Sequence, residues 1–171
     1  MKRIGFIGFG LRSETMLKAF RALEADICVA AVADPRHAQI APGMKDDPYF
    51  AHTRWYEDAE ELLACDDLDG VFIGTRCPLH TPLACRVLKT GMPLFLEKPV
   101  CISPEQYEAL REAGRGQEKR VVVSFPLRFS TITLEMEKLV RSGSLGRLTM
   151  VQAVNNVPYG SVYYHSWYRD P

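Results

Sequence analysis

The chain has 171 residues, of which 47% are hydrophobic and 25% are charged. This length is enough for one domain with a packed core, or for one domain and part of another. The apolar fraction excludes an intrinsically disordered chain. The 21 basic and 21 acidic residues cancel, so we expect neither nucleic acid nor an anionic membrane as the main partner.

Targeting signals are weak along the sequence. The longest uninterrupted apolar run is Ile27–Ala33, far short of the roughly 18–20 residues that a membrane-spanning helix needs. Residues 1–10 resemble the charged and apolar regions of a secretory signal, but three glycines interrupt them and no cleavage site follows. The five cysteines form no C-x-x-C pair, which is typical of reduced thiols. We therefore expect a cytoplasmic protein without a disulfide framework.

Apolar runs and helical patterns alternate over the first 125 residues. Helical patterns cover residues 11–24 and 80–90, and capping sequences at 58–61 and 103–106 predict two further helix starts. Such alternation is typical of repeated βαβ units. We predict an α/β fold, a doubly wound, mostly parallel sheet of the Rossmann type. The strands are expected at residues 3–9, 27–33, 71–74, 94–96 and 120–125.

The pattern changes after Pro126. Apolar residues between Phe129 and Val140 follow helical spacing and predict an amphipathic helix that ends near Gly143. Residues 147–154 alternate in character and predict a single strand, and an aromatic tail follows. We expect a Rossmann domain over residues 1–125. Residues 126–171 are expected to begin a second, incomplete α+β domain.

A glycine motif follows the first predicted strand directly. Gly8-Phe9-Gly10-Leu11-Arg12-Ser13 is the pattern G-x-G-x-x-G with serine at the third glycine. The first glycine permits a tight turn, and the second lets the backbone approach a pyrophosphate at the N-terminus of the next helix. A small serine still allows close packing of helix and strand. The motif predicts a dinucleotide site, and the alternative is an ordinary glycine-containing turn.

An acidic residue ends the second predicted strand. Asp34 lies 24 residues after Gly10, where a carboxylate can accept hydrogen bonds from the adenosine ribose. This charge repels a 2′-phosphate and favours NAD over NADP, although Arg12 and Arg36 are close enough in sequence to reverse the preference. The alternative is that Asp34 only caps the next helix.

The tripeptide Glu97-Lys98-Pro99 follows the strand that ends at Leu96. Ligands of doubly wound sheets collect at the carboxyl ends of the strands, so we expect Lys98 to point into the cofactor cleft. Its ammonium can polarise a hydroxyl or carbonyl oxygen there. The alternative is a solvated loop. Cys77, His80 and Cys85 are irregularly spaced and lack a fourth ligand, so we expect no metal site.

Together these motifs resemble the N-terminal part of the glucose–fructose oxidoreductase, inositol dehydrogenase and MocA (Gfo/Idh/MocA) family. The resemblance covers essentially the whole chain, and its pieces occur in family order. They are the glycine loop, Ala33-Asp34-Pro35, Gly74-Thr75 with Pro78 and His80, Leu96-Glu97-Lys98-Pro99-Val100, Phe125-Pro126-Leu127-Arg128-Phe129, residues 142–146 and Trp167-Tyr168-Arg169-Asp170.

The resemblance implies an NAD(P)-dependent oxidoreductase that transfers hydride between nicotinamide and a sugar, polyol or related hydroxyl or carbonyl compound. It implies that Lys98 is the active-site lysine and that Arg128 faces the cleft between domains. Ser13 and Arg76-Cys77 depart from the family pattern and leave the choice between NAD and NADP open. The residues that it implies at the cofactor are Gly8, Gly10, Leu11, Arg12, Asp34, Thr75, Pro78, His80 and Glu97.

Length is the larger departure from the family. Family members continue with a glycine-rich segment and a helix that carries an Asp and a His, and they have a second domain that covers the substrate and forms the oligomer. We therefore expect a small-molecule substrate and a homo-oligomer for a full-length form. Two alternatives are a shortened, catalytically silent cofactor-binding module or sensor, and a remnant Rossmann domain that binds no nucleotide.

Overall fold

The computed structural model describes residues 1–156 and 160–166. The chain packs as two compact units, Met1–Phe125 and Pro126–Pro171.

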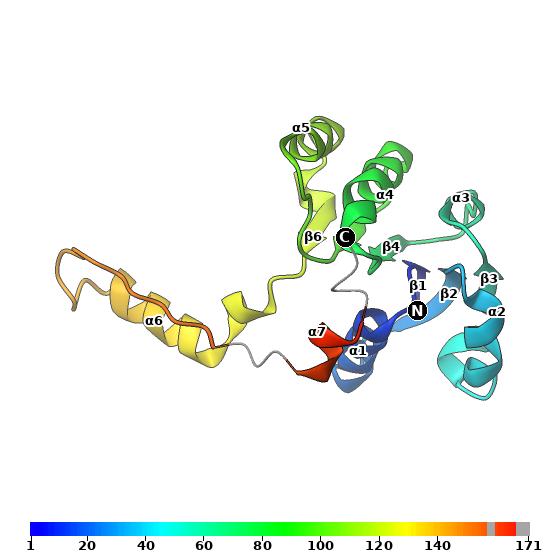
Figure 1. The fold of residues 1–171 in the computed structure, drawn as a ribbon, viewed down its shortest axis with the longest axis horizontal. Helices are drawn as coiled ribbons and strands as arrows, with labels where there is room; N and C mark the ends of the chain where they lie inside the picture. The colour runs from blue at the N-terminus through cyan, green and yellow to red at the C-terminus, as the bar shows by residue number, and fades with distance from the viewer. Residues whose placement is uncertain (157–159, 167–171) are drawn as a thin grey trace. The chain divides into compact units, whose positions relative to one another are not determined.

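The first unit is built on a six-stranded sheet with the strand order β3-β2-β1-β4-β5-β6 (Figure 1). Every pair of neighbouring strands is parallel. The predicted doubly wound α/β fold is therefore confirmed. The order reverses between β1 and β4, and ligands of such sheets bind beside this reversal at the carboxyl ends of the strands. The strands are β1 (Lys2–Ile7), β2 (Ile27–Ala33), β3 (Arg54–Tyr56), β4 (Gly70–Ile73), β5 (Leu94–Leu96) and β6 (Val121–Val123).

Helices connect the strands, and local signals fix several of their ends. The Asp58 carboxylate accepts the amides of Glu60 and Glu61 at 2.8 and 3.2 Å, and Ser103 Oγ accepts the amide of Gln106 at 3.2 Å. Gly91, with φ +75°, ends the fourth helix as expected. The helices are α1 (Leu11–Ala22), α2 (His37–Ile40), α3 (Ala59–Leu63), α4 (Cys77–Thr90) and α5 (Pro104–Ala113), with short 3-10 turns η1 (Ala41–Met44), η2 (Pro48–Phe50) and η3 (Glu118–Arg120).

The core consists of two clusters, one on each face of the sheet. Successive strand residues point to opposite faces, so Phe6 joins one cluster and Ile7 the other. The cluster with Phe6 includes Leu17 of α1 and Phe50 of η2, whereas the cluster with Ile7 includes Leu62 of α3 and several residues of α4. Burial on both faces explains why β2 and β4 carry no polar side chains.

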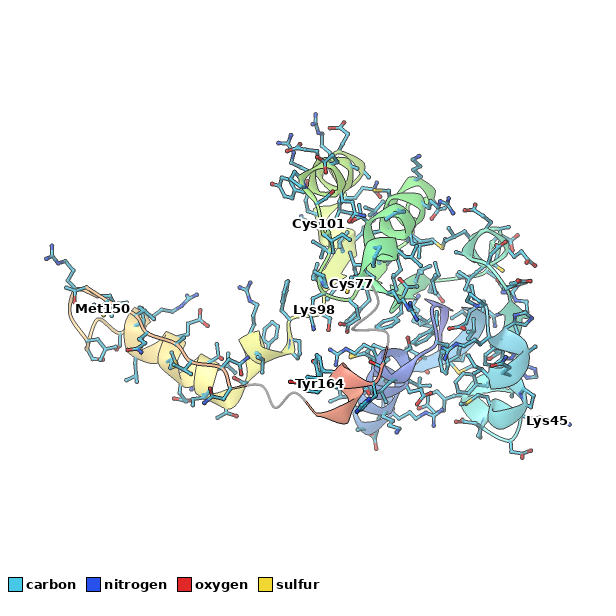
Figure 2. The ribbon with its side chains drawn as sticks, viewed as in Figure 1. Lys45, Cys77, Lys98, Cys101, Met150 and Tyr164 are labelled. Carbon is cyan, nitrogen blue, oxygen red and sulfur yellow. The ribbon has the colours of Figure 1, made fainter. Side chains whose placement is uncertain are left out.

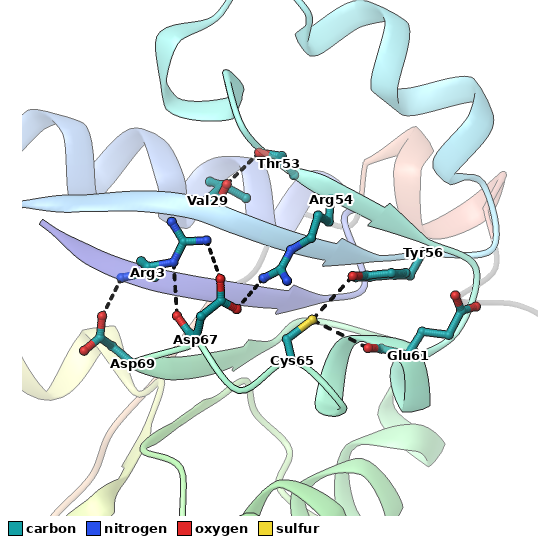
Figure 3. Close-up of polar contacts among 9 residues, drawn as sticks. All are labelled: Arg3, Val29, Thr53, Arg54, Tyr56, Glu61, Cys65, Asp67 and Asp69. Carbon is teal, nitrogen blue, oxygen red and sulfur yellow. Dashed lines mark hydrogen bonds and ion pairs between the residues drawn. The ribbon is translucent and has the colours of Figure 1, made fainter.

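A polar network connects strands at the amino edge of the sheet, which is opposite the carboxyl edge (Figure 3). Asp67 Oδ2 accepts Arg3 Nη2 at 2.7 Å, and Asp67 Oδ1 accepts Arg54 Nη2 at 2.5 Å. Asp69 accepts the backbone amide of Arg3 at 2.8 Å. These bonds join β1, β3 and the loop before β4, so this edge is held by the protein's own charges.

The second unit contains η4 (Pro126–Phe129), α6 (Thr131–Arg141) and α7 (Ser161–Tyr164). Ser130 caps α6 by accepting the amide of Thr133 at 3.3 Å. The predicted strand over residues 147–154 is wrong, because the backbone there forms no strand. A strand needs a partner for its ladder, and the described part of this unit contains no other strand. The expected aromatic tail lies partly outside the described residues. Among the described helices, none is long and apolar enough to span a membrane.

Candidate functional site

The turn after β1 requires its first glycine. Gly8 has φ +79°, a conformation that residues with a side chain rarely adopt. A Cβ at this position would lie 2.8 Å from Thr75 Cγ2 and 3.0 Å from the carbonyl oxygen of Gly74. The Gly8 amide also donates to the carbonyl of Ala33 at 2.8 Å. The fold itself therefore demands glycine here.

Gly10 is a glycine for a different reason. It precedes α1 with φ −100° and ψ −171°, an extended conformation open to any residue, and no side chain caps the helix start. A Cβ here would meet only Arg36 Nη2, at 3.9 Å. The space that a side chain would fill is open in front of the first amides of α1. Such a cradle fits the pyrophosphate of a dinucleotide.

Ser13 fulfils the packing role of the third glycine. Its side chain is fully buried, and its hydroxyl donates to the carbonyl of Gly8 at 2.6 Å. A Cβ on Gly74 would lie 2.6 Å from Ser13 Oγ, so α1 and the end of β4 are already in close contact. Serine therefore keeps the helix near the sheet and also satisfies a turn carbonyl.

Asp34, at the end of β2, is buried and surrounded by donors. Its Oδ2 accepts the amide of Phe9 at 2.8 Å, and its Oδ1 accepts the amide of Arg36 at 2.8 Å. The Arg36 guanidinium adds Nε on Oδ1 at 3.1 Å and Nη2 on Oδ2 at 3.2 Å. Burial alone raises the pKa of Asp34, but the hydrogen bonds from Arg36 and Phe9 outweigh it and lower that pKa. The group therefore stays a carboxylate.

Arg12 links the glycine turn to the ends of β5 and β6. Its Nε donates to Glu97 Oε1 at 2.7 Å, and its Nη2 donates to Ser124 Oγ at 3.1 Å. Glu97 and Ser124 are buried, whereas the Arg12 side chain is 39% exposed. The buried carboxylate is thus balanced by a partly solvated cation. Ser124 was not singled out from the sequence, although it follows the carboxyl end of a strand and that rule could have found it.

Lys98 follows Glu97 directly in the chain and is exposed. The amide of Glu97 donates to the carbonyl of Ile73 at 3.1 Å. This bond holds the start of the loop that carries Lys98 against the end of β4. Cys77 begins α4 shortly after the same strand, and both side chains are labelled in Figure 2. The Lys98–Pro99 peptide is cis. An exposed ammonium at the carboxyl edge of the sheet can reach a ligand bound there.

The remaining residues that were predicted at the site differ in their exposure to solvent. His80 is buried, with Nδ1 2.7 Å from the Pro99 carbonyl oxygen and Nε2 3.0 Å from that of Thr75. It joins the loops after β4 and β5, whereas Pro78 and Leu11 are exposed. Arg128 is exposed in η4 of the second unit. The first unit thus brings Gly8, Gly10, Arg12, Asp34, Thr75, Glu97 and Lys98 to the carboxyl edge of one sheet.

Comparisons with known proteins agree with the Rossmann-type fold. Residues 2–125 match a family described as "Oxidoreductase family, NAD-binding Rossmann fold". An inositol 2-dehydrogenase of Corynebacterium glutamicum is 28% identical over 160 residues, which cover 91% of this chain and 46% of that protein. A glycosyl hydrolase family 109 protein of Shewanella is 29% identical over 154 residues, or 85% of this chain and 33% of that protein. The chain thus spans about half the length, or less, of these curated relatives.

Solved structures show the same fold. The myo-inositol dehydrogenase of Lactobacillus casei, solved with NAD(H) and myo-inositol, has a TM-score of 0.77 at 22% identity, covering 85% of this chain and 43% of that one. The myo-inositol dehydrogenase of Corynebacterium glutamicum has a TM-score of 0.72 at 24% identity, covering 86% and 43%.

Proposed function

Because this chain belongs to the oxidoreductase family with an NAD-binding Rossmann fold, we propose that it forms the cofactor-binding part of an NAD(P)-dependent oxidoreductase. A bound nicotinamide supplies hydride transfer to or from a carbon of the substrate. The proposed substrate is inositol, a sugar, or a related hydroxyl or carbonyl compound. The names of the inositol dehydrogenases among its relatives support this class.

The observation that carries the proposal is the open turn at Gly10. The fold needs no glycine there, since an added Cβ would meet only Arg36 Nη2, at 3.9 Å. We propose that the first amides of α1, at Leu11 and Arg12, hold the diphosphate by hydrogen bonds and by the partial positive charge of the helix N-terminus. In this proposal, Thr75 lies beside the cofactor in the loop after β4, and Glu97 lies near the nicotinamide ribose.

We propose Lys98 as the catalytic residue. Its exposed ammonium follows β5 at the carboxyl edge, where it can donate a hydrogen bond to the substrate oxygen. Donation stabilises negative charge that develops on that oxygen, and the same group can hold a proton there. Arg128 is proposed as a second substrate contact, since it lies in the family-like segment Phe125-Pro126-Leu127-Arg128-Phe129.

NADH binding by the 171-residue chain tests the proposal directly. We expect the fluorescence of NADH to change saturably on titration with wild-type protein and to stay unchanged with Gly10→Ala of equal thermal stability. A titration without signal up to millimolar NADH contradicts the proposal and leaves a Rossmann domain that binds no nucleotide. Binding without turnover of any polyol, in a form extended to the length of the relatives, supports the silent module instead.

Three further proposals concern a longer form of the protein. Residues 126–171 begin a second domain that completes the substrate site. That form assembles as a homo-oligomer and acts in the cytoplasm on a small molecule. The mass of the extended protein in solution and its location in fractionated cells test these statements.

A further inference from the structure

His80, in the first turn of α4, contacts the loop that carries Lys98. The residue is 2% exposed. Its Nδ1 lies 2.7 Å from the carbonyl oxygen of Pro99, the residue after Lys98, and its Nε2 lies 3.0 Å from the carbonyl oxygen of Thr75. One side chain thus connects the loop after β4 with the loop after β5. Because both ring nitrogens are engaged by the backbone, His80 acts on a bound ligand through these loops.

Both partners of the His80 ring are carbonyl oxygens, which accept hydrogen bonds and cannot donate them. A neutral imidazole carries one N–H, so its other nitrogen would present a lone pair to a carbonyl oxygen. Such a contact is costly in a buried site. The imidazolium form donates from both nitrogens, and hydrogen bonds from a charged donor are stronger than those from a neutral one. The geometry therefore favours the doubly protonated ring.

Two further side chains hold the same loop. Thr81, which is buried next to His80 in α4, donates from Oγ1 to the carbonyl of Val100 at 2.7 Å. Gln106 of α5 accepts the amide of Ile102 on Oε1 at 3.0 Å. The backbone that follows the exposed lysine is thus fixed by side chains of two helices.

We propose that His80 is a positioning residue for the reaction, an imidazolium that donates from both ring nitrogens and holds the loop of Lys98 against the loop after β4. This inference rests on the proposed function, because it assumes that Lys98 acts on the substrate. A lysine side chain is long and flexible. A fixed backbone confines the region in which its ammonium can donate to a substrate oxygen, and such orientation contributes to the rate. Loss of the second ring proton removes one of the two bonds and loosens the loop.

Other ionisable groups lie on the elements around His80. Titration of any of them also alters nearby signals and pH profiles, so the test must follow the His80 ring itself. These groups are Arg76, Cys77 and Cys85 at the start of α4 and within it, Glu97, Lys98 and Cys101 after β5, and Glu105 at the start of α5.

NMR of the 171-residue chain tests the protonation of the ring. Long-range ¹H–¹⁵N spectra distinguish the imidazolium from either neutral tautomer, and comparison with His80→Gln assigns the signals. We expect both nitrogens of His80 to be protonated over at least part of the range from about pH 5 to 8. The amides of Arg76 and Val100 directly follow the two accepting carbonyls, so their shifts should change with the protonation state of the ring. A ring that stays a single neutral tautomer down to about pH 5 overturns the inference.

Substitution tests whether the ring positions the lysine. His80→Gln offers donors on only one atom and cannot serve both carbonyls. We expect the ¹H–¹⁵N heteronuclear NOE of Lys98 to fall in this variant, while that of Phe95 in β5 stays unchanged. The matched control is His52→Gln, which replaces an exposed histidine and should leave both values as in wild type.

Thermal melting shows whether His80→Gln is folded. If it is not, the ring spectra of wild type still decide the protonation state, and Thr81→Val reports on the loop. This second variant removes the bond to the Val100 carbonyl while keeping the shape of the side chain. We expect a smaller fall of the Lys98 NOE than in His80→Gln. An unchanged Lys98 NOE in every folded variant overturns the inference.

Cofactor binding and turnover separate positioning from general support of the fold. NADH affinity of the 171-residue chain should change by less than about threefold in His80→Gln, because the glycine turn is untouched. In a form extended to the relatives' length, kcat should fall about tenfold or more while the KM for the cofactor stays nearly constant. Parallel losses of NADH affinity and loop order in a folded variant mean that His80 only supports the fold, which overturns the inference.

The outcomes distinguish the inference from the proposed function. NADH binding by wild type, together with an undisturbed Lys98 loop in folded His80→Gln, overturns the role of His80 and leaves the proposed function intact. If wild type does not bind NADH, the proposed function fails, and the role of His80 in the reaction fails with it.

Discussion

The two glycines of the turn predict opposite behaviour on substitution by alanine. At Gly8, φ is +79° and an added Cβ would lie 2.8 Å from Thr75 Cγ2. The left-handed conformation costs alanine roughly 1–2 kcal/mol and the overpacking about 1–3 kcal/mol more. At Gly10 the conformation suits alanine and the nearest atom is 3.9 Å away. Alanine there gains about 0.4–1 kcal/mol because it restricts the unfolded chain, but a loss of similar size at this N-cap position offsets the gain.

Thermal or urea denaturation measures the first half of this prediction. Gly8→Ala should destabilise the chain by about 2–5 kcal/mol, which lowers the melting temperature by roughly 4–20 °C. Gly10→Ala should melt close to the wild-type temperature. It should nevertheless lose NADH binding, because its methyl group occupies the space proposed for the diphosphate.

The combination of results decides between the two roles. A Gly10→Ala variant that binds NADH like wild type refutes the placement of the diphosphate at this turn. Equal destabilisation by both substitutions refutes the distinction between a glycine that the fold needs and one that the ligand needs. Gly43→Ala is a suitable control, since no atom lies within 4 Å of its added Cβ and it is remote from the turn in sequence.

Three further predictions follow from the charged groups at this edge. Arg12→Met leaves the buried Glu97 without its ion-pair partner. This variant should destabilise the fold by about 1–3 kcal/mol in urea denaturation, a value already discounted for the partial exposure of Arg12. Adding Glu97→Gln should recover part of the loss, and additive effects of the two substitutions contradict the pairing. The pKa of Asp34 is lowered in the folded state, so the unfolded chain binds the proton more readily. The stabilisation that this group contributes is therefore present above its unfolded pKa, near the ordinary value of 3.8. It is lost as pH falls through the lower folded value. Asp34→Asn should therefore flatten the acid limb of stability against pH, and an unchanged limb argues against the Arg36 pairing. Lys98→Met should leave the melting temperature and NADH affinity nearly unchanged while lowering turnover in a form extended to the relatives' length, and wild-type turnover there rules out the catalytic role.

The sequence was most informative where burial on both faces of the sheet leaves continuous apolar runs. The strand at Ile27–Ala33 was predicted with its observed bounds for this reason. Strand β3 was missed, because Arg54, Trp55 and Tyr56 form a short edge strand without an apolar run. Residues 147–154 show the reverse error, since alternation of side chains indicates a strand only where a partner strand exists.

Only the local features of the site could be predicted from the sequence. The topology and the glycine motif indicate which strand ends meet, and the structure places Gly8, Asp34 and Lys98 at the same edge. The partners of charged groups depend on distant residues: Arg12 and Glu97 are 85 positions apart, yet they form an ion pair. The burial of His80 against two backbone carbonyls likewise depends on the packing of separate loops.

The central claim is that the first amides of α1 hold the diphosphate of a nicotinamide dinucleotide. Titration of the ¹⁵N-labelled chain with NADH, followed amide by amide by NMR, tests it most directly. We expect the largest shifts at Gly10, Leu11 and Arg12, with smaller ones after β2 and β4. Saturable shifts confined to the amino edge around Arg3 and Arg54, or unchanged amides at Gly10 to Arg12, would contradict the account.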